Sequence, residues 1–186
     1  MRFTNLLGTP ILFLSCGFAQ IKDTGTRTIY YLQDAAHKQW CGYSSEARMK
    51  SQIQPLRSMI LGKAEYENDR VSKILVTEAD ETGDWAVNDE YAVSGNGKIQ
   101  SLKRTINIIP EDISEEQQFV IENGKPVKQR SALRELRTGR PTQKSVDWFQ
   151  PPTIVISING FPFSGLLLSK KEAIWLNGEL CVPDSN

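Results

Sequence analysis

Few residues in this chain could carry catalytic chemistry at a recognisable spacing. His37 is the only histidine, so sites that need two histidines, including common zinc patterns, are excluded. His37 and Cys41 lie close enough in sequence to suggest a thiolate activated by an imidazole. No third orienting group is evident, and we favour the alternative in which Cys41 forms a disulfide and His37 lies in a polar loop. No serine lies in a Gly-x-Ser-x-Gly motif either.

Two acidic stretches could supply carboxylate chemistry. Residues 80–84 (Asp-Glu-Thr-Gly-Asp) offer hard oxygen ligands on a glycine-containing turn, as Ca²⁺ prefers, but their spacing does not match the twelve-residue calcium loop. Asp112 could pair with Glu115 or Glu116 in acid–base work, yet residues 110–116 read as an exposed acidic turn. We therefore expect no metal site, no cofactor and no catalytic residue in these stretches.

Positive charge is concentrated in residues 125–144, which hold seven basic residues and one acidic residue. Arg134, Arg137 and Arg140 are the candidate contacts for an anion such as a glycan, a lipid headgroup or a nucleic acid. Runs of charge are usually solvated surfaces, and we favour that interpretation. Because the formal net charge of the whole chain is zero, we expect no nucleic-acid partner.

Residues 1–19 have the pattern of a secretory signal peptide. Arg2 precedes a mostly apolar stretch that ends in Gly17-Phe18-Ala19. The stretch is shorter than the roughly 20 residues of a membrane-spanning helix, and Pro10 interrupts it. We expect cleavage after Ala19 to leave residues 20–186 as one secreted or periplasmic domain of a bacterial protein, without a transmembrane span.

The predicted compartment decides how the three cysteines are interpreted. Cleavage after Ala19 removes Cys16 and leaves Cys41 and Cys181, which we expect to form a disulfide in an oxidising environment. Alternatively, Phe13-Leu14-Ser15-Cys16-Gly17 resembles a bacterial lipoprotein signal. That resemblance implies a lipid anchor at Cys16 that would hold the protein at the cell envelope.

Hairpins dominate the expected structure of residues 20–186. Apolar alternation over 85–93 and a turn at Asn96-Gly97, with Gly95 opposite Lys98, set a pairing register for 85–109. In that register Tyr91 faces Leu102, and Asp89 meets Arg104. Further apolar pairs are Val87 with Ile106 and Trp85 with Ile108; on the other face Glu90 pairs with Lys103 and Ala92 with Ser101.

Other segments extend this hairpin pattern. Asn123-Gly124 predicts a second hairpin with Glu122 opposite Lys125 and Val120 opposite Val127, and Pro126 places its strand at an edge. Asn177-Gly178 suggests a third hairpin over 174–181. Strands are also expected at 71–78, 153–158 and 163–169, with 59–67 pairing to 71–78 through Asn68-Asp69. Residues 45–54 could form a short helix or a strand, and 131–137 is ambiguous.

We therefore expect a mainly β fold with a single antiparallel domain built from hairpins or a meander. Its strands would form a curved sheet or a small sandwich, with at most one or two short helices. The absence of catalytic motifs favours a non-enzymatic binding or envelope-associated domain for an unknown ligand or protein partner. The alternative is an extracytoplasmic hydrolase that uses carboxylates, since these need no histidine. Two facing carboxyl groups in a pocket, one of them desolvated, would favour the hydrolase.

Overall fold

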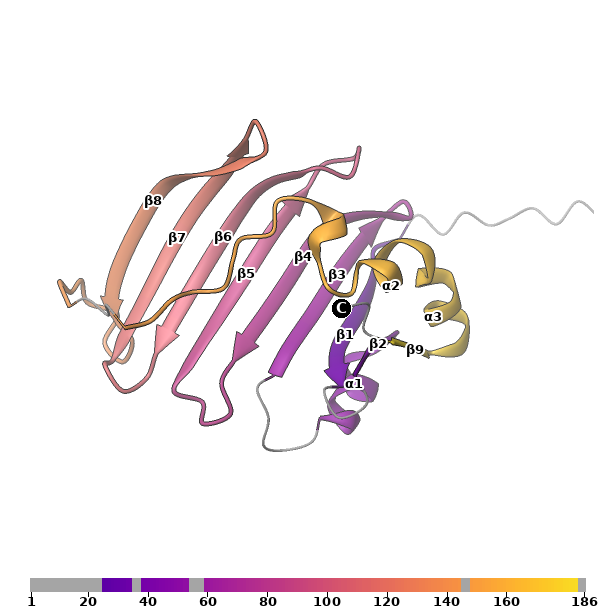
Figure 1. The fold of residues 1–186 in the computed structure, drawn as a ribbon, viewed down its shortest axis with the longest axis horizontal. Coiled ribbons are helices and arrows are strands. Elements are labelled where there is room, and N and C mark those ends of the chain that lie inside the picture. The colour runs from indigo at the N-terminus through magenta and orange to yellow at the C-terminus, as the bar shows by residue number, and fades with distance from the viewer. Residues whose placement is uncertain (1–24, 35–37, 54–58, 145–147, 184–186) are drawn as a thin grey trace, which may run out of the picture.

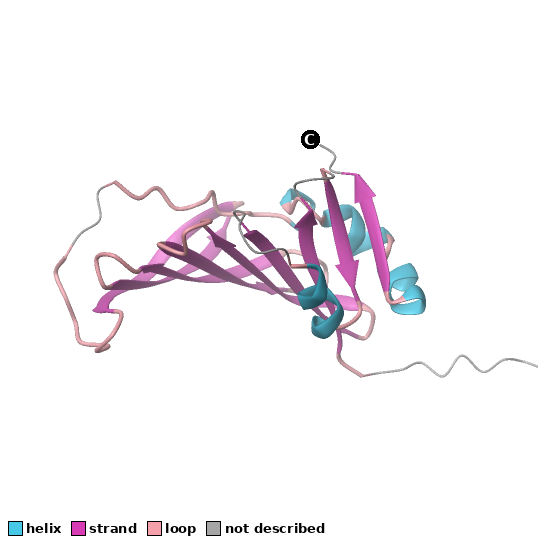
Figure 2. Ribbon diagram, turned by 90° about the horizontal axis from the view of Figure 1, so that it is seen from below, coloured by secondary structure: helices cyan, strands magenta, loops and turns pink. Residues whose placement is uncertain are grey.

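The computed structural model describes residues 25–34, 38–53, 59–144 and 148–183, and within these ranges nine strands form one open antiparallel sheet (Figure 1). The strand order is β8-β7-β6-β5-β4-β3-β1-β2-β9. The strands are β1 (Arg27–Asp34), β2 (Gln39–Tyr43), β3 (Met59–Glu67), β4 (Arg70–Ala79), β5 (Trp85–Val93), β6 (Ile99–Ile108), β7 (Ile113–Glu122), β8 (Lys125–Glu135) and β9 (Glu179–Pro183). The expected mainly β, antiparallel fold is confirmed, and Figure 2 shows that the sheet is twisted and curved.

Strands β3 to β8 are successive hairpins, and the register predicted for β5 and β6 is confirmed from Trp85 to Ala92. The tip of this hairpin differs from the prediction. The Ser94 amide donates to the Lys98 carbonyl at 2.8 Å, and only Gly97 in the turn has a positive φ, 79°. The register shifts beside Val93 and so absorbs the longer turn. Pairing of the strand side chains, rather than the turn type, therefore sets the register.

The turns at Asn68-Asp69 and Asn123-Gly124 form as predicted. Both residues of each turn have positive φ, between 51° and 73°, which a type I′ hairpin requires. In the second hairpin the predicted pairs, Glu122 with Lys125 and Val120 with Val127, are present. The edge position predicted from Pro126 is also confirmed, because β8 is the outermost strand on its side.

Residues 136–178, here called the crossing segment, carry the chain from β8 over one face of the sheet to β9 at the opposite edge (Figure 1). The segment holds a 3-10 turn, η1 (Ile158–Gly160), and the helices α2 (Ser164–Ser169) and α3 (Lys171–Asn177). The strands predicted at 153–158 and 163–169, and the hairpin at 174–181, are therefore wrong. Gly178, at φ 84°, ends α3 as a left-handed C-cap instead of forming a hairpin turn.

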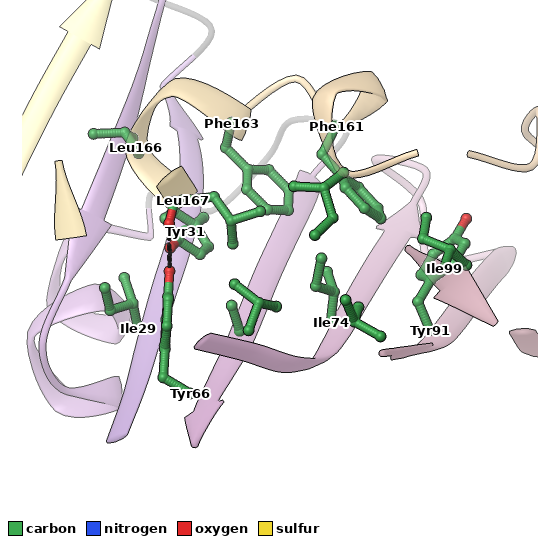
Figure 3. Packing of buried hydrophobic residues seen from close by; sticks show 14 of the residues in the cluster. Ile29, Tyr31, Tyr66, Ile74, Tyr91, Ile99, Phe161, Phe163, Leu166 and Leu167 are labelled. Carbon is green, nitrogen blue, oxygen red and sulfur yellow. Dashed lines mark hydrogen bonds between the residues drawn. The ribbon is translucent and has the colours of Figure 1, made fainter. Parts of the chain in front are cut away.

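The crossing segment covers the inner face of the sheet with large apolar side chains. The ring of Phe163 stacks on Tyr31 with centroids 4.5 Å apart, and Phe161 meets Tyr91 edge-on at 5.0 Å (Figure 3). The Tyr66 hydroxyl donates to the Leu167 carbonyl at 2.9 Å, so the Tyr31 hydroxyl donates to Tyr66, also at 2.9 Å. These contacts fix the segment over β1 to β5.

Two glycines allow this close packing. A Cβ atom at Gly62 would lie 2.8 Å from the ring of Phe163, and one at Gly42 would lie 2.5 Å from Ile174 Cδ1. Both distances are too short for carbon atoms in contact. Because Gly42 on β2 and Gly62 on β3 have no side chain, the crossing segment can lie directly on the backbone of the sheet at these two positions.

A smaller apolar cluster lies on the outer face at the β9 edge, beneath the short helix α1 (Glu46–Gln52). Ser45 caps α1 by accepting a hydrogen bond from the Arg48 amide. Of the two structures predicted for residues 45–54, a short helix or a strand, the helix is therefore the one that forms. Met49 packs on this cluster, which includes the predicted disulfide between Cys41 and Cys181. Including α2 and α3, the described residues form three short α-helices, one more than expected.

Several predictions lie outside the described residues: the signal peptide at 1–19, the lipidation site at Cys16, and His37. Among the described helices, none combines the length and apolar character needed to cross a lipid bilayer.

Removing the disulfide tests how far it stabilises the sheet. Cys41 and Cys181 face each other on β2 and β9 and are 140 residues apart in sequence. We expect Cys41→Ala/Cys181→Ala to lower the free energy of unfolding by about 2–5 kcal/mol, because the bond constrains the unfolded chain. Urea denaturation of the oxidised protein and the double variant measures this loss, and an unchanged midpoint would contradict it.

Candidate functional site

A buried ion pair lies at the centre of the inner face of the sheet. Asp89 on β5 and Arg104 on β6 are directly opposite each other and only 6% and 3% exposed. Arg104 donates from Nε to Asp89 Oδ1 at 2.7 Å and from Nη2 to Oδ2 at 2.6 Å. Burial disfavours the charged guanidinium, but the hydrogen bonds and charge of Asp89 raise the pKa of Arg104. The two groups therefore remain a charged, bidentate pair.

Tyr91 connects this ion pair to the crossing segment. The Val155 amide donates to the Tyr91 hydroxyl at 3.3 Å, and that hydroxyl donates to Asp89 Oδ2 at 3.1 Å. Burial, followed by the nearby charge of Asp89, raises the pKa of Tyr91 well above its usual value. Tyr91 thus keeps its proton and its donor role, and its hydroxyl links Asp89 to the crossing segment.

Polar side chains continue from the ion pair toward the β8 edge. Gln117 on β7 lies opposite Arg104, and Ser131 on β8 lies opposite Gln117. Glu115 accepts a hydrogen bond from Gln117 Nε2 at 2.8 Å and another from Ser131 Oγ at 2.6 Å. We call Asp89, Arg104, Glu115, Gln117 and Ser131 the polar row. Within the row, Asp89 and Arg104 orient each other, and Gln117 and Ser131 orient Glu115.

A cavity of about 390 Å³ lies between β6 to β8 and the crossing segment, beside the polar row. Glu115, Gln117 and Ser131 form its polar side, with Lys144 of the crossing segment. The rest of the lining is apolar and comprises Ile106, Ile108, Ile113, Leu133, Phe149 and Pro151. This volume is within the range of small-molecule sites, and a mainly apolar wall with a few fixed polar groups is typical of them.

Aromatic contacts and Glu111 hold the outer wall of the cavity in place. Phe149 packs against Trp85 of β5 with ring centroids 5.3 Å apart, and Trp148 meets Phe149 edge-on. Trp148 Nε1 donates to Glu111 Oε1 at 3.3 Å, and Lys144 Nζ donates to the Glu111 carbonyl at 3.2 Å. The turn between β6 and β7 thus anchors both described parts of this wall.

On the side of the ion pair away from the polar row, strand β4 carries a further carboxyl group, that of Glu78. It lies opposite Val87, one inner-face position from Asp89. Burial, followed by the negative charge of Asp89, raises the pKa of Glu78. Both oxygens of Asp89 already accept hydrogen bonds from Arg104, so Asp89 is not free to act as a nucleophile or base beside Glu78.

The three arginines predicted to contact an anion are all exposed near the end of β8. Arg134 lies opposite Pro141, which follows Arg140, and its Nη1 donates to the Gly139 carbonyl. Arg137, in the turn between them, forms an ion pair with Asp112 at 3.2 Å. The structure therefore places the arginines on one short stretch of surface, and part of the charge of Arg137 is already balanced.

The other acidic residues considered as candidates form hydrogen bonds or ion pairs within the protein. Asp80 accepts from the Thr82 hydroxyl and from the Trp85 amide, which closes the turn before β5. Glu116 pairs with Lys103 on the outer face at 2.9 Å. Among the described residues, no group of three or more potential ligand side chains could hold a metal ion.

Sequence reasoning identified the pair of Asp89 and Arg104 but missed its burial. The signal was present, because Asp89 lies two residues from both Val87 and Tyr91 and so shares their face of β5. Glu115 was considered only as a partner of Asp112 in an exposed acidic turn, and Gln117 was not considered; both share the inner face of β7 with Ile113 and Phe119.

No protein-family model, curated protein sequence or solved structure matches this chain. The function is therefore inferred from the geometry of the inner face.

Breaking the ion pair should destabilise the protein more than replacing it. Arg104→Met leaves the Asp89 carboxylate buried without its cation, and we expect a loss of roughly 3–5 kcal/mol in the free energy of unfolding. Asp89→Leu/Arg104→Met should recover most of that loss, because no buried charge remains. Urea denaturation of both variants measures the difference; equal losses would show that the buried charge is not the cause.

The raised pKa of Glu78 predicts how stability depends on pH. A carboxyl group with a higher pKa in the folded state than in the unfolded state binds more protons when folded, so its contribution to stability falls as pH rises through that window. Glu78→Gln removes this penalty. We expect the variant to have a higher Tm than the parent at pH 7, and no advantage at pH 4. A Tm difference that does not change with pH would contradict this.

Proposed function

We propose that this chain is an extracytoplasmic, non-enzymatic binding domain that holds a small amphipathic molecule on the inner face of its sheet. The ligand would occupy the cavity between β6 to β8 and the crossing segment, beside the polar row. The observation that carries the proposal is the cavity of about 390 Å³, which combines an apolar wall with hydrogen-bonded polar groups that converge on one side.

The lining favours a ligand with an apolar body and a polar end that donates hydrogen bonds. Ile106, Ile108 and Leu133 offer an aliphatic surface on the sheet side, and Phe149 offers an aromatic surface opposite. The polar end would meet the carboxylate of Glu115, which accepts hydrogen bonds but has none to give when ionised. Gln117 and Ser131 hold this carboxylate in place, so binding requires little reorganisation.

The ion pair supports binding rather than hydrolysis. A hydrolase that uses two carboxyl groups needs one to protonate the leaving group and another that is free to attack or to activate water. Glu78, with its raised pKa, suits the first role. Asp89 does not suit the second, because Arg104 occupies both of its oxygens and its side chain is buried. The hydrolase remains the second candidate, and the environment of Glu78 is the observation in its favour.

The disulfide supports a location outside the cytoplasm, since such bonds persist in oxidising compartments. Secretion through the leader at 1–19, or lipid anchoring at Cys16, is the accompanying part of the proposal. The intact mass of the protein from its native host distinguishes the two, because an acylated Cys16 adds the mass of its fatty chains.

Fluorescence of N-phenyl-1-naphthylamine, an apolar dye with one N–H donor, tests the binding site. We expect dye emission to rise on binding to the parent protein. Leu133→Arg places a charge in the apolar wall, and we expect it to weaken dye binding at least about tenfold, a difference of about 1.4 kcal/mol. Titrations followed by dye emission give the Kd values.

Val127→Arg is the matched control, because Val127 is also on β8 but lies opposite Val120, away from the cavity. Its Kd should equal that of the parent. If Leu133→Arg does not fold, Phe149→Ala removes the opposite wall and should also weaken binding. Binding that survives both substitutions, or that Val127→Arg weakens equally, would overturn the proposed site.

A further inference from the structure

A second and larger cavity, of about 620 Å³, lies in the corner between one end of the central strands β3 to β6 and the helices α2 and α3, away from the polar row. The turn between β3 and β4, the turn between β5 and β6, and the helices α2 and α3 surround it. The crossing segment therefore forms one side of each cavity, but different parts of the segment are involved. We call this second space the corner cavity.

The floor of the corner cavity is apolar. Val71, Ile158 and Leu167 line it, and all three belong to the main core or pack within it. Leu168 also lines the cavity, and it is 47% exposed although it is a large aliphatic residue. An exposed leucine beside buried aliphatic side chains offers a continuous surface on which an alkyl chain could pack.

Two cations stand over this floor. Arg70 Nη1 donates to the Gly95 carbonyl at 3.0 Å, and Lys171 Nζ donates to the Asp69 carbonyl. Lys171 also lies 5.7 Å from the ring centroid of Tyr66. These partners position the cations without neutralising them, because backbone carbonyls and aromatic rings carry no net charge. Neither cation belongs to an ion pair found among the described residues.

The charges that line the corner cavity therefore sum to about one positive charge, since Asp69 is the only acidic residue in the lining. A cationic opening over an aliphatic floor is complementary to a molecule with an anionic head and an alkyl chain. We propose that the corner cavity binds an anionic amphiphile, with its phosphate or carboxylate head between Arg70 and Lys171 and its chain against Ile158, Leu167 and Leu168.

Calorimetric titration with dodecyl phosphate, below its micellar concentration, tests the proposal on the protein that begins at Gln20. We expect dodecyl phosphate to bind at least about tenfold more tightly than inorganic phosphate, because its chain buries apolar surface. It should also bind more tightly than dodecyl maltoside, which has the chain without the charge. Flotation with phosphatidylglycerol vesicles, compared with phosphatidylcholine vesicles, shows whether a membrane lipid can also supply the head.

Arg70→Gln/Lys171→Gln removes both cations, and we expect it to weaken binding of dodecyl phosphate about tenfold or more. Lys125→Gln/Lys128→Gln removes the same charge from the far edge at β8 and should leave the Kd unchanged. Equal losses in the two variants would show a general charge effect and overturn the assignment, as would inorganic phosphate binding as tightly as dodecyl phosphate.

Dye binding at the first cavity separates this test from that of the proposed function. Arg70→Gln/Lys171→Gln should bind N-phenyl-1-naphthylamine like the parent, and Leu133→Arg should bind dodecyl phosphate like the parent. Dodecyl phosphate binding that is lost in Leu133→Arg and kept in Arg70→Gln/Lys171→Gln would place the amphiphile in the first cavity and overturn the corner site.

Discussion

The architecture depends on one constraint: an open antiparallel sheet with an apolar inner face is stable only if something covers that face. No second sheet does so within the described residues; the crossing segment performs this role, with Phe161, Phe163 and Leu167 as its main anchors. Burial of apolar side chains, these three among them, is the main driving force for folding. The glycines at 42 and 62 matter because they let a single layer of chain lie close enough to exclude water.

The same constraint explains where the cavities lie. The segment is anchored over β1 to β5 by stacked rings and by the hydroxyl groups of Tyr66 and Tyr91. Over β6 to β8 the described part of the cover is a loop with few large side chains; Phe149 packs on Trp85, and a cavity remains beside it over these strands. Glu115, Gln117 and Ser131 of the polar row line this space, where a small molecule could contact them, whereas Asp89 and Arg104 are buried behind them.

The sequence predicted those parts of the fold that depend on residues close to one another along the chain. The register of β5 and β6 followed from complementary pairs such as Asp89 with Arg104, and the edge strand followed from Pro126. It failed for 153–178, where apolar residues form short turns and helices because they pack on a sheet that is distant in sequence. The cavity lining could not be predicted either, since Leu133 and Phe149 line one cavity only through tertiary packing, and alternation alone does not show that Glu115 faces inward.

The disulfide has a topological consequence. The bond between Cys41 and Cys181 closes a covalent ring that contains strands β3 to β8 and the whole crossing segment. One edge of the sheet is thereby tied to the end of the chain that covers it. The crossing segment is therefore held covalently at both ends, by β8 at one end and by the disulfide on β9 at the other. A single cut by a protease in an exposed loop of this ring would leave two fragments that separate only after reduction.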